Sequence, residues 1–228
     1  METPIDQQPR PVGKPSMLGI ILEPTKQFER IRENPRVALP LILLLVAFGL
    51  VGTWTGFLSA DSPTTGSEVP VWLTVGMAAI VMALGVGVAL LLTSLFHWLL
   101  TLLFRGEASY KQIFSLNTHL YILVLLSMIV TYTVASLTDV DPLQPVAPTS
   151  LAAVIDAKGF IGGILSGIEV FALWQLVLTA MGLSVIARIS RGKAWTAALI
   201  IFVAGLLIAG ATGAMTEFTQ QMQGMNGG

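Results

Sequence analysis

Five long apolar runs, almost free of charged side chains, set the strongest limit on the fold of this chain. The first, Val37 to Leu58, is about 33 Å long at a helical rise of about 1.5 Å per residue, enough to cross a hydrocarbon core of about 30 Å. Only 11% of the residues are charged, against about a quarter in soluble proteins. Backbone N–H and C=O groups must be paired internally in lipid. We therefore predict an all-α polytopic membrane protein, a bundle of five transmembrane helices.

The predicted spans together form a membrane domain over residues 37–215. The second run, Val71 to Phe104, is about 51 Å long as a helix, which is more than one crossing needs and less than two. We predict one helix there, either tilted or bent at Gly85 and Gly87. The five spans cover about residues 37–58, 71–104, 113–137, 167–187 and 195–215.

The segments that flank the spans differ in character. Residues 1–15 hold four prolines and few apolar side chains, and we predict a disordered tail. Residues 16–36 mix apolar and basic side chains and predict an amphipathic cytoplasmic segment lying on the membrane surface, with a charged juxtamembrane linker as the alternative. Residues 138–161 form the longest connection, and 216–228 are polar and Gly-rich, which predicts a disordered outer tail.

The distribution of positive charge predicts the orientation. All of the 12 Lys and Arg residues except Lys158 lie before the first span, in the 105–112 loop or in the 188–193 loop. Cytoplasmic loops carry an excess of Lys and Arg. With five spans, this places the N-terminus in the cytoplasm and the C-terminus outside, in an integral inner (cytoplasmic) cell membrane protein.

Small residues spaced four apart predict close helix packing. Gly52 and Gly56 form such a pair in the first span, and Gly205, Ala209 and Gly213 form a series in the last. Small side chains let two helix backbones approach closely in a membrane. The contact can join helices of one chain or of two copies, so a homo-oligomer is one possible assembly.

Four polar residues inside or near the spans are candidates for an intramembrane site. His97 and His119 each lie about 11 residues from the middle of the 105–112 turn, so they are expected at similar depth, as a proton relay or as structural or interfacial residues. Glu169 is expected at the outer interface as a snorkelling acid. The alternative is a cation or proton site made with Gln175, one to two turns deeper.

Basic residues at the predicted cytoplasmic side are candidates for binding a partner or lipid. Their spacing predicts that Arg188 and Arg191 lie in the last turn of the fourth span, with Gly192 ending that helix. There they either anchor the loop or dock an anionic lipid headgroup or an acidic partner. The full set of tentative binding residues is Arg30, Arg32, Arg105, Lys111, Arg188, Arg191 and Lys193.

No motif in the sequence indicates an enzyme. There is no Cys, no phosphate-binding glycine loop, no dinucleotide fingerprint and no basic stripe suited to nucleic acid. Two His residues alone are an incomplete metal site. We expect no catalytic residue, cofactor, metal ion or nucleic-acid partner.

Three stretches together resemble the Yip family of Ypt/Rab-interacting membrane proteins, in its compact bacterial branch. They are LGIILEPTKQFERIRENPRVALPL (18–41), RGEASYKQIFSL (105–116) and MGLSVIARISRGKAW (181–195). The resemblance implies five helices, a cytoplasmic N-terminus and action by contact. Eukaryotic relatives bind small GTPases, and some bacterial ones accompany ABC-type exporters. The short N-terminal region departs from the eukaryotic pattern, and no binding residue is carried over.

These observations support a non-enzymatic membrane scaffold or accessory protein. Its expected partners are membrane lipids and a membrane or cytoplasmic protein, with an ABC-type exporter as one candidate. The alternative is a small ion- or proton-coupled transporter or channel that uses the polar residues along a path.

Overall fold

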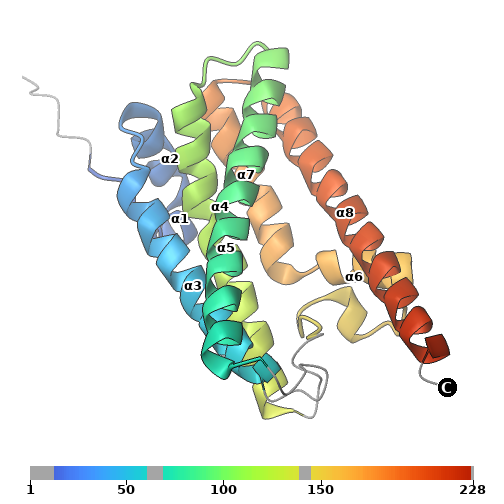
Figure 1. Ribbon diagram of the computed structural model, residues 1–228. Helices are drawn as coiled ribbons and strands as arrows, with labels where there is room; N and C mark the ends of the chain where they lie inside the picture. Colours follow the sequence, from blue (N-terminus) through green and yellow to red (C-terminus); the bar gives the residue numbers. More distant parts are fainter. Residues whose placement is uncertain (1–12, 61–68, 139–144, 227–228) are drawn as a thin grey trace, which may run out of the picture.

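The computed structural model describes residues 13–60, 69–138 and 145–226, and it confirms the all-α bundle (Figure 1). Five helices are long and apolar enough to cross a membrane. They are α3 (Ala38–Ala60), α4 (Val71–Leu103), α5 (Tyr110–Leu137), α7 (Val170–Ala187) and α8 (Arg191–Asn226). The shorter elements are α1 (Gly19–Leu22), α2 (Pro24–Glu33), α6 (Gly159–Gly167) and a 3-10 turn, η1 (Leu151–Ala153).

Helix α5 is the centre of the bundle, because it contacts α2, α3, α4 and α7. A capping box at Ser109 starts the helix: the Ser109 side chain accepts from the Gln112 N–H, and the Gln112 side chain accepts from the Ser109 N–H. One apolar cluster joins α5 to α2 and α7, and a second joins it to α3 and α4.

Helices α3 and α4 pack with their backbones close together. A Cβ atom placed on Gly52 would lie 2.6 Å from the carbonyl oxygen of Ala78, and one on Gly56 would lie 2.8 Å from the Cα of Val75. A side chain at either position would therefore separate the helices. The close packing predicted for this glycine pair is confirmed, and its partner is α4 of the same chain.

The α2 helix is amphipathic as expected, but it does not rest on the membrane by its apolar face. Phe28 and Ile31 are fully buried, in the same cluster as α5 and α7 residues, and Ile20 of α1 joins them. Leu18 and Leu22 remain exposed. Burying an apolar stripe is favourable both in a protein groove and in lipid. The sequence pattern alone therefore did not distinguish packing against the bundle from binding to the membrane surface.

The end of the chain also differs from the prediction. Helix α8 continues to Asn226, so residues 216–226 are helical where a disordered tail was expected. Gln, Met and Glu in this stretch favour helix, and the short helix α6 packs along this half of α8. The predicted disordered tail of residues 1–15 lies, apart from residues 13–15, outside the described residues.

The bundle has two distinct ends. The basic end is formed by α1, α2, the 104–109 loop and the 188–190 loop. The far end is formed by residues 145–168 and the C-terminal half of α8, which lies at the opposite end of the bundle (Figure 1).

Candidate functional site

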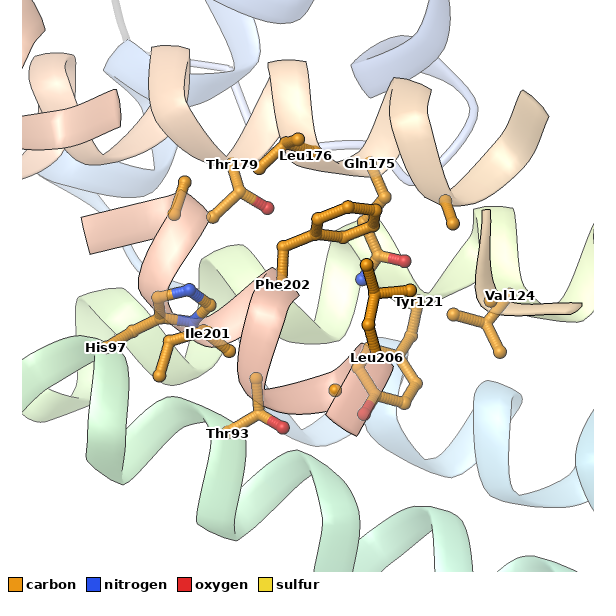
Figure 2. A pocket seen from close by; sticks show the side chains of 14 residues that line it. Thr93, His97, Tyr121, Val124, Gln175, Leu176, Thr179, Ile201, Phe202 and Leu206 are labelled. Carbon is orange, nitrogen blue, oxygen red and sulfur yellow. The ribbon is translucent and has the colours of Figure 1, made fainter. Parts of the chain in front are cut away.

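A cavity of about 260 Å³ lies among α4, α5, α7 and α8 (Figure 2). We call it the central cavity. Its polar side chains are Thr93, His97, Tyr121, Gln175 and Thr179, which come from three different spans, α4, α5 and α7. Its other lining residues are apolar or glycine, and none is charged. The cavity is therefore suited to an uncharged guest with a few hydrogen-bonding atoms.

One ring nitrogen of His97 has a hydrogen-bond partner, and the other has none among the described residues. The side-chain amide nitrogen of Asn117 lies 3.0 Å from the Ser94 Oγ and 3.4 Å from the His97 Nδ1. The imidazole is 4% exposed, and its Nε2 has no hydrogen-bond partner among the described residues. A buried polar atom left unpaired costs free energy, which marks it as a candidate for binding.

His119 lies elsewhere in the bundle. It follows Asn117 by two positions on α5, a rotation of about 200° around the helix, so it faces away from His97. Its Nδ1 lies 2.7 Å from the carbonyl oxygen of Ser115 and can only donate to it, while Nε2 is buried without a partner in the part of the chain described. The structure does not bring the two histidines into one site.

Glu169 and Gln175 are also separated. Gln175 reaches the central cavity, whereas Glu169 precedes α7 at the far end. Both carboxylate oxygens of Glu169 accept from the Ser127 hydroxyl at 2.7 Å, and one accepts from Thr149 at 3.2 Å. Glu169 therefore ties α7 to α5 and to the segment before η1, and it does not line the cavity with Gln175.

Several predicted basic residues are paired within the chain. Arg188 forms an ion pair of 3.0 Å with Glu107, and Lys193 donates to the carbonyl oxygen of Phe104 at 3.2 Å. Arg32 and Arg188 also line a cleft of about 300 Å³ at the basic end, together with Glu33 and Glu107. Charges of both signs face this cleft, so it does not present a simple anion site.

The N-terminal cations are partly satisfied as well. Arg30 donates to the carbonyl oxygen of Lys14 and to Gln27, both at 3.4 Å. Lys26 lies 2.9 Å from Glu23, and this hydrogen bond and its charge hold the pKa of Glu23 below its usual value. All of these contacts join residues of the segment before α3 to one another.

Several cations at the basic end are exposed and form no ion pair with any residue that the structure describes. Apart from Lys14 and from Lys193, which donates to the Phe104 carbonyl oxygen, they are Arg36, Arg105, Lys111 and Arg191. Three of these were predicted as binding residues. Arg36 was not among them, although its position just before the first span is the usual place for an orienting cation.

The α7–α8 turn differs from the prediction. Helix α7 ends at Ala187 because Arg188 adopts the left-handed conformation, with φ 53° and ψ 35°. Ser190 then starts α8, since its carbonyl oxygen accepts from the Ala194 N–H at 3.0 Å. Arg191 and Gly192 thus lie in the first turn of α8, and not in the last turn of the fourth span. The α4–α5 turn also contains a left-handed residue, Arg105, with φ 60°.

Sequence reasoning missed most of the polar residues around the central cavity. Thr93, Tyr121 and Thr179 were not candidates, and neither were Ser94 and Asn117, which surround His97. The available signal was their polarity within spans, most clearly for Asn117, because a buried amide in a membrane helix needs a partner.

The fold and these sites define the class of the protein: an integral, multi-pass, all-α membrane protein whose described helices line an uncharged central cavity. The model of the Yip1 domain matches residues 18–212, and the chain belongs to this family. The membrane protein YknW of Bacillus subtilis (strain 168) is 35% identical over 208 residues, which cover 86% of this chain and 87% of YknW. The family resemblance is confirmed. No solved structure matches the chain.

Proposed function

We propose that this protein is a non-enzymatic scaffold or accessory protein that acts through contacts at its basic end. In this proposal it resides in the cell membrane, with the N-terminus and the basic end in the cytoplasm and the C-terminus outside. The strong bias of Lys and Arg toward one end of the bundle supports this orientation.

The observation that carries the proposal is the group of exposed cations without an ion pair among the described residues, Arg36, Arg105, Lys111 and Arg191. Lys111 and Arg191 lie in the first turns of α5 and α8, and Arg36 follows α2, which is packed into the bundle through Phe28 and Ile31. A cation near an anionic membrane surface contributes about 1 kcal/mol. The surface suits anionic lipid headgroups or an acidic face of a membrane or cytoplasmic protein, and the family resemblance makes an ABC-type exporter one candidate.

The experiment compares two triple variants purified from native membrane in mild detergent. The first replaces the unpaired cations Arg105, Lys111 and Arg191 with Gln. The control replaces the ion-paired cations Lys26, Arg32 and Arg188 with Gln, at the same end and with the same change in net charge. The measurement is the amount of co-purified protein partner and of anionic lipid per chain.

We expect the first variant to bind roughly a hundredfold more weakly, since three contacts of about 1 kcal/mol are lost, and the control to change little. Topology is checked with single cysteines at Gly192 and Gly224, because the chain has no native Cys and both positions have open space. Equal loss in both variants, or no partner and no bound anionic lipid for the unaltered protein, would contradict the proposal.

One observation favours a second candidate, a small ion- or proton-coupled transporter. His97 and Gln175 line the same cavity, midway along the bundle. However, no carboxylate lines this cavity, and Glu169 is engaged by Ser127 and Thr149. Protein reconstituted in liposomes and showing no flux driven by a pH or ion gradient would remove this candidate.

A further inference from the structure

The central cavity opens toward the lipid. Gly205 lines it, is exposed, and has no atom within 4 Å of a Cβ placed on it. It lies 14 positions after Arg191, about 21 Å along α8 from the basic end, and His97 lies about 9 Å from the end of α4. Both depths fall within a hydrocarbon core of about 30 Å. A guest that enters beside Gly205 must therefore come from the bilayer.

The contact between Asn117 and His97 determines which ring nitrogen of His97 can donate a hydrogen bond to such a guest. The Asn117 amide nitrogen can only donate, so the His97 Nδ1 that faces it accepts. The ring is then neutral with its proton on Nε2, and Nε2 is the buried atom without a partner among the described residues. His97, which lines the cavity, thus carries an unused N–H donor whose nitrogen is covered, and its side chain is 4% exposed and fixed in place by the Asn117–Ser94 pair.

The remaining lining selects against charge. Figure 2 shows the Thr179 hydroxyl and the His97 ring on the same side of the cavity as Ile201, with Phe202 and Leu206 between them and Tyr121. A charged group would meet no opposite charge among the lining residues, and its desolvation would go uncompensated. A hydrocarbon chain would fit the apolar walls but would leave the His97 donor unpaired.

We propose that the central cavity is a binding site for an uncharged, lipid-soluble carbonyl compound, which enters from the bilayer beside Gly205 and accepts a hydrogen bond from His97 Nε2. The size of the cavity limits the part of the guest that it encloses. A cavity of about 150 Å³ holds benzene, so about 260 Å³ encloses about ten non-hydrogen atoms. This site is independent of the contacts proposed at the basic end.

Three probes of nearly equal size test the proposal: 2-decanone, decane and decanoate. The protein is labelled with ¹⁵N-histidine and reconstituted in dioleoylphosphatidylcholine liposomes, and the two histidine side chains are observed by solid-state NMR. Because His97 and His119 are the only histidines, the His97→Gln variant assigns both sets of signals. His119, buried on another side of α5, is the internal control.

We expect 2-decanone to shift the His97 Nε2 signal in a saturable way and to leave His119 unchanged. Decane, which cannot accept a hydrogen bond, should bind about tenfold more weakly, and decanoate should not compete. An unmoved His97 signal, an equal response to decane, or a parallel shift of His119 would overturn the proposal.

A matched pair of variants locates the binding site. Gly205→Leu places a side chain at the mouth of the cavity and should abolish the shift. Gly85→Leu makes the same change at an exposed α4 position that also has open space but does not line the cavity, and it should leave binding intact. Binding that survives Gly205→Leu would overturn the proposed entrance. If that variant does not fold, the comparison of 2-decanone with decane on the unaltered protein still decides.

Discussion

Two parts of α8 use the same residue type in different ways. Near the far end, a Cβ placed on Gly213 would meet the carbonyl oxygen of Gly159 and lie 3.1 Å from the Cα of Gly163, so α6 and α8 are in backbone contact. Two turns earlier, Gly205 meets nothing within 4 Å and faces the central cavity. A small residue on a membrane helix can therefore provide close packing or leave open space, and its spacing alone does not say which.

The largest expected effect comes from a bulky side chain in the packed part. A Cβ on Gly163 of α6 would meet the carbonyl oxygen of Ala209 and lie 2.9 Å from the Cα of Gly210, and backbone atoms cannot move aside as a side chain can. We expect Gly163→Leu to lower the free energy of unfolding by about 3 kcal/mol or more. The measurement is unfolding by SDS titration in mixed micelles. Gly205→Leu is the control, and equal losses in both variants would refute the contrast.

Adding a single methyl group should have opposite effects on the free energy of unfolding in the two parts of α8. We expect Gly213→Ala to destabilise by about 1–3 kcal/mol, because the added carbon overlaps the α6 backbone. Gly205→Ala should instead stabilise by about 0.5–1 kcal/mol, since alanine favours helix and finds open space. The same SDS titration measures both variants. A stabilising Gly213→Ala would show that α6 and α8 are not in such close contact, and a destabilising Gly205→Ala would show that Gly205 does not face open space.

The parts of the fold that follow from local sequence were predictable. Length and hydropathy were sufficient for the five spans, and the pair Gly52 and Gly56 was sufficient for a close contact, though not for its partner. Helix α6 was not predicted, because its nine residues are too few for a span and include several glycines. It is stabilised by α8, a contact that local propensity does not contain.

The central cavity could not be predicted for a related reason. In a soluble protein, hydrophobic periodicity separates the core from the solvent. In a span, the lipid side and the protein side are both apolar, so the pattern does not show which polar side chains converge. Ser94 and Asn117 are 23 residues apart and meet only because α4 and α5 pack together. His97 and Gln175 were identified individually, but not as members of one site.

A substitution at Glu169 tests whether the side-chain hydrogen bonds of this residue also stabilise the packed far end. Glu169→Gln keeps the shape of the side chain but removes the charge from the contacts with Ser127 and Thr149. Hydrogen bonds to a charged group contribute about 1.5–3 kcal/mol and neutral ones about 1 kcal/mol, so we expect a loss of about 1 kcal/mol. Unfolding by SDS measures it. Ser127→Ala in the same background should then cost less than it does alone, and additive losses would argue against a direct contact.

The basic end gives the smallest expected effect. The Arg188 and Glu107 side chains form an ion pair, but they are 63% and 69% exposed, and exposed pairs contribute about 0–1 kcal/mol. Arg188 also holds a left-handed conformation that an L-residue adopts at a cost of about 1–2 kcal/mol, which glycine avoids. Arg188→Gly therefore loses the pair and relieves the backbone, and we expect the two to cancel within about 1 kcal/mol. Arg188→Ala keeps the strain and should lie below the glycine variant in the same titration. If the alanine variant is the more stable of the two, the backbone at Arg188 is not strained.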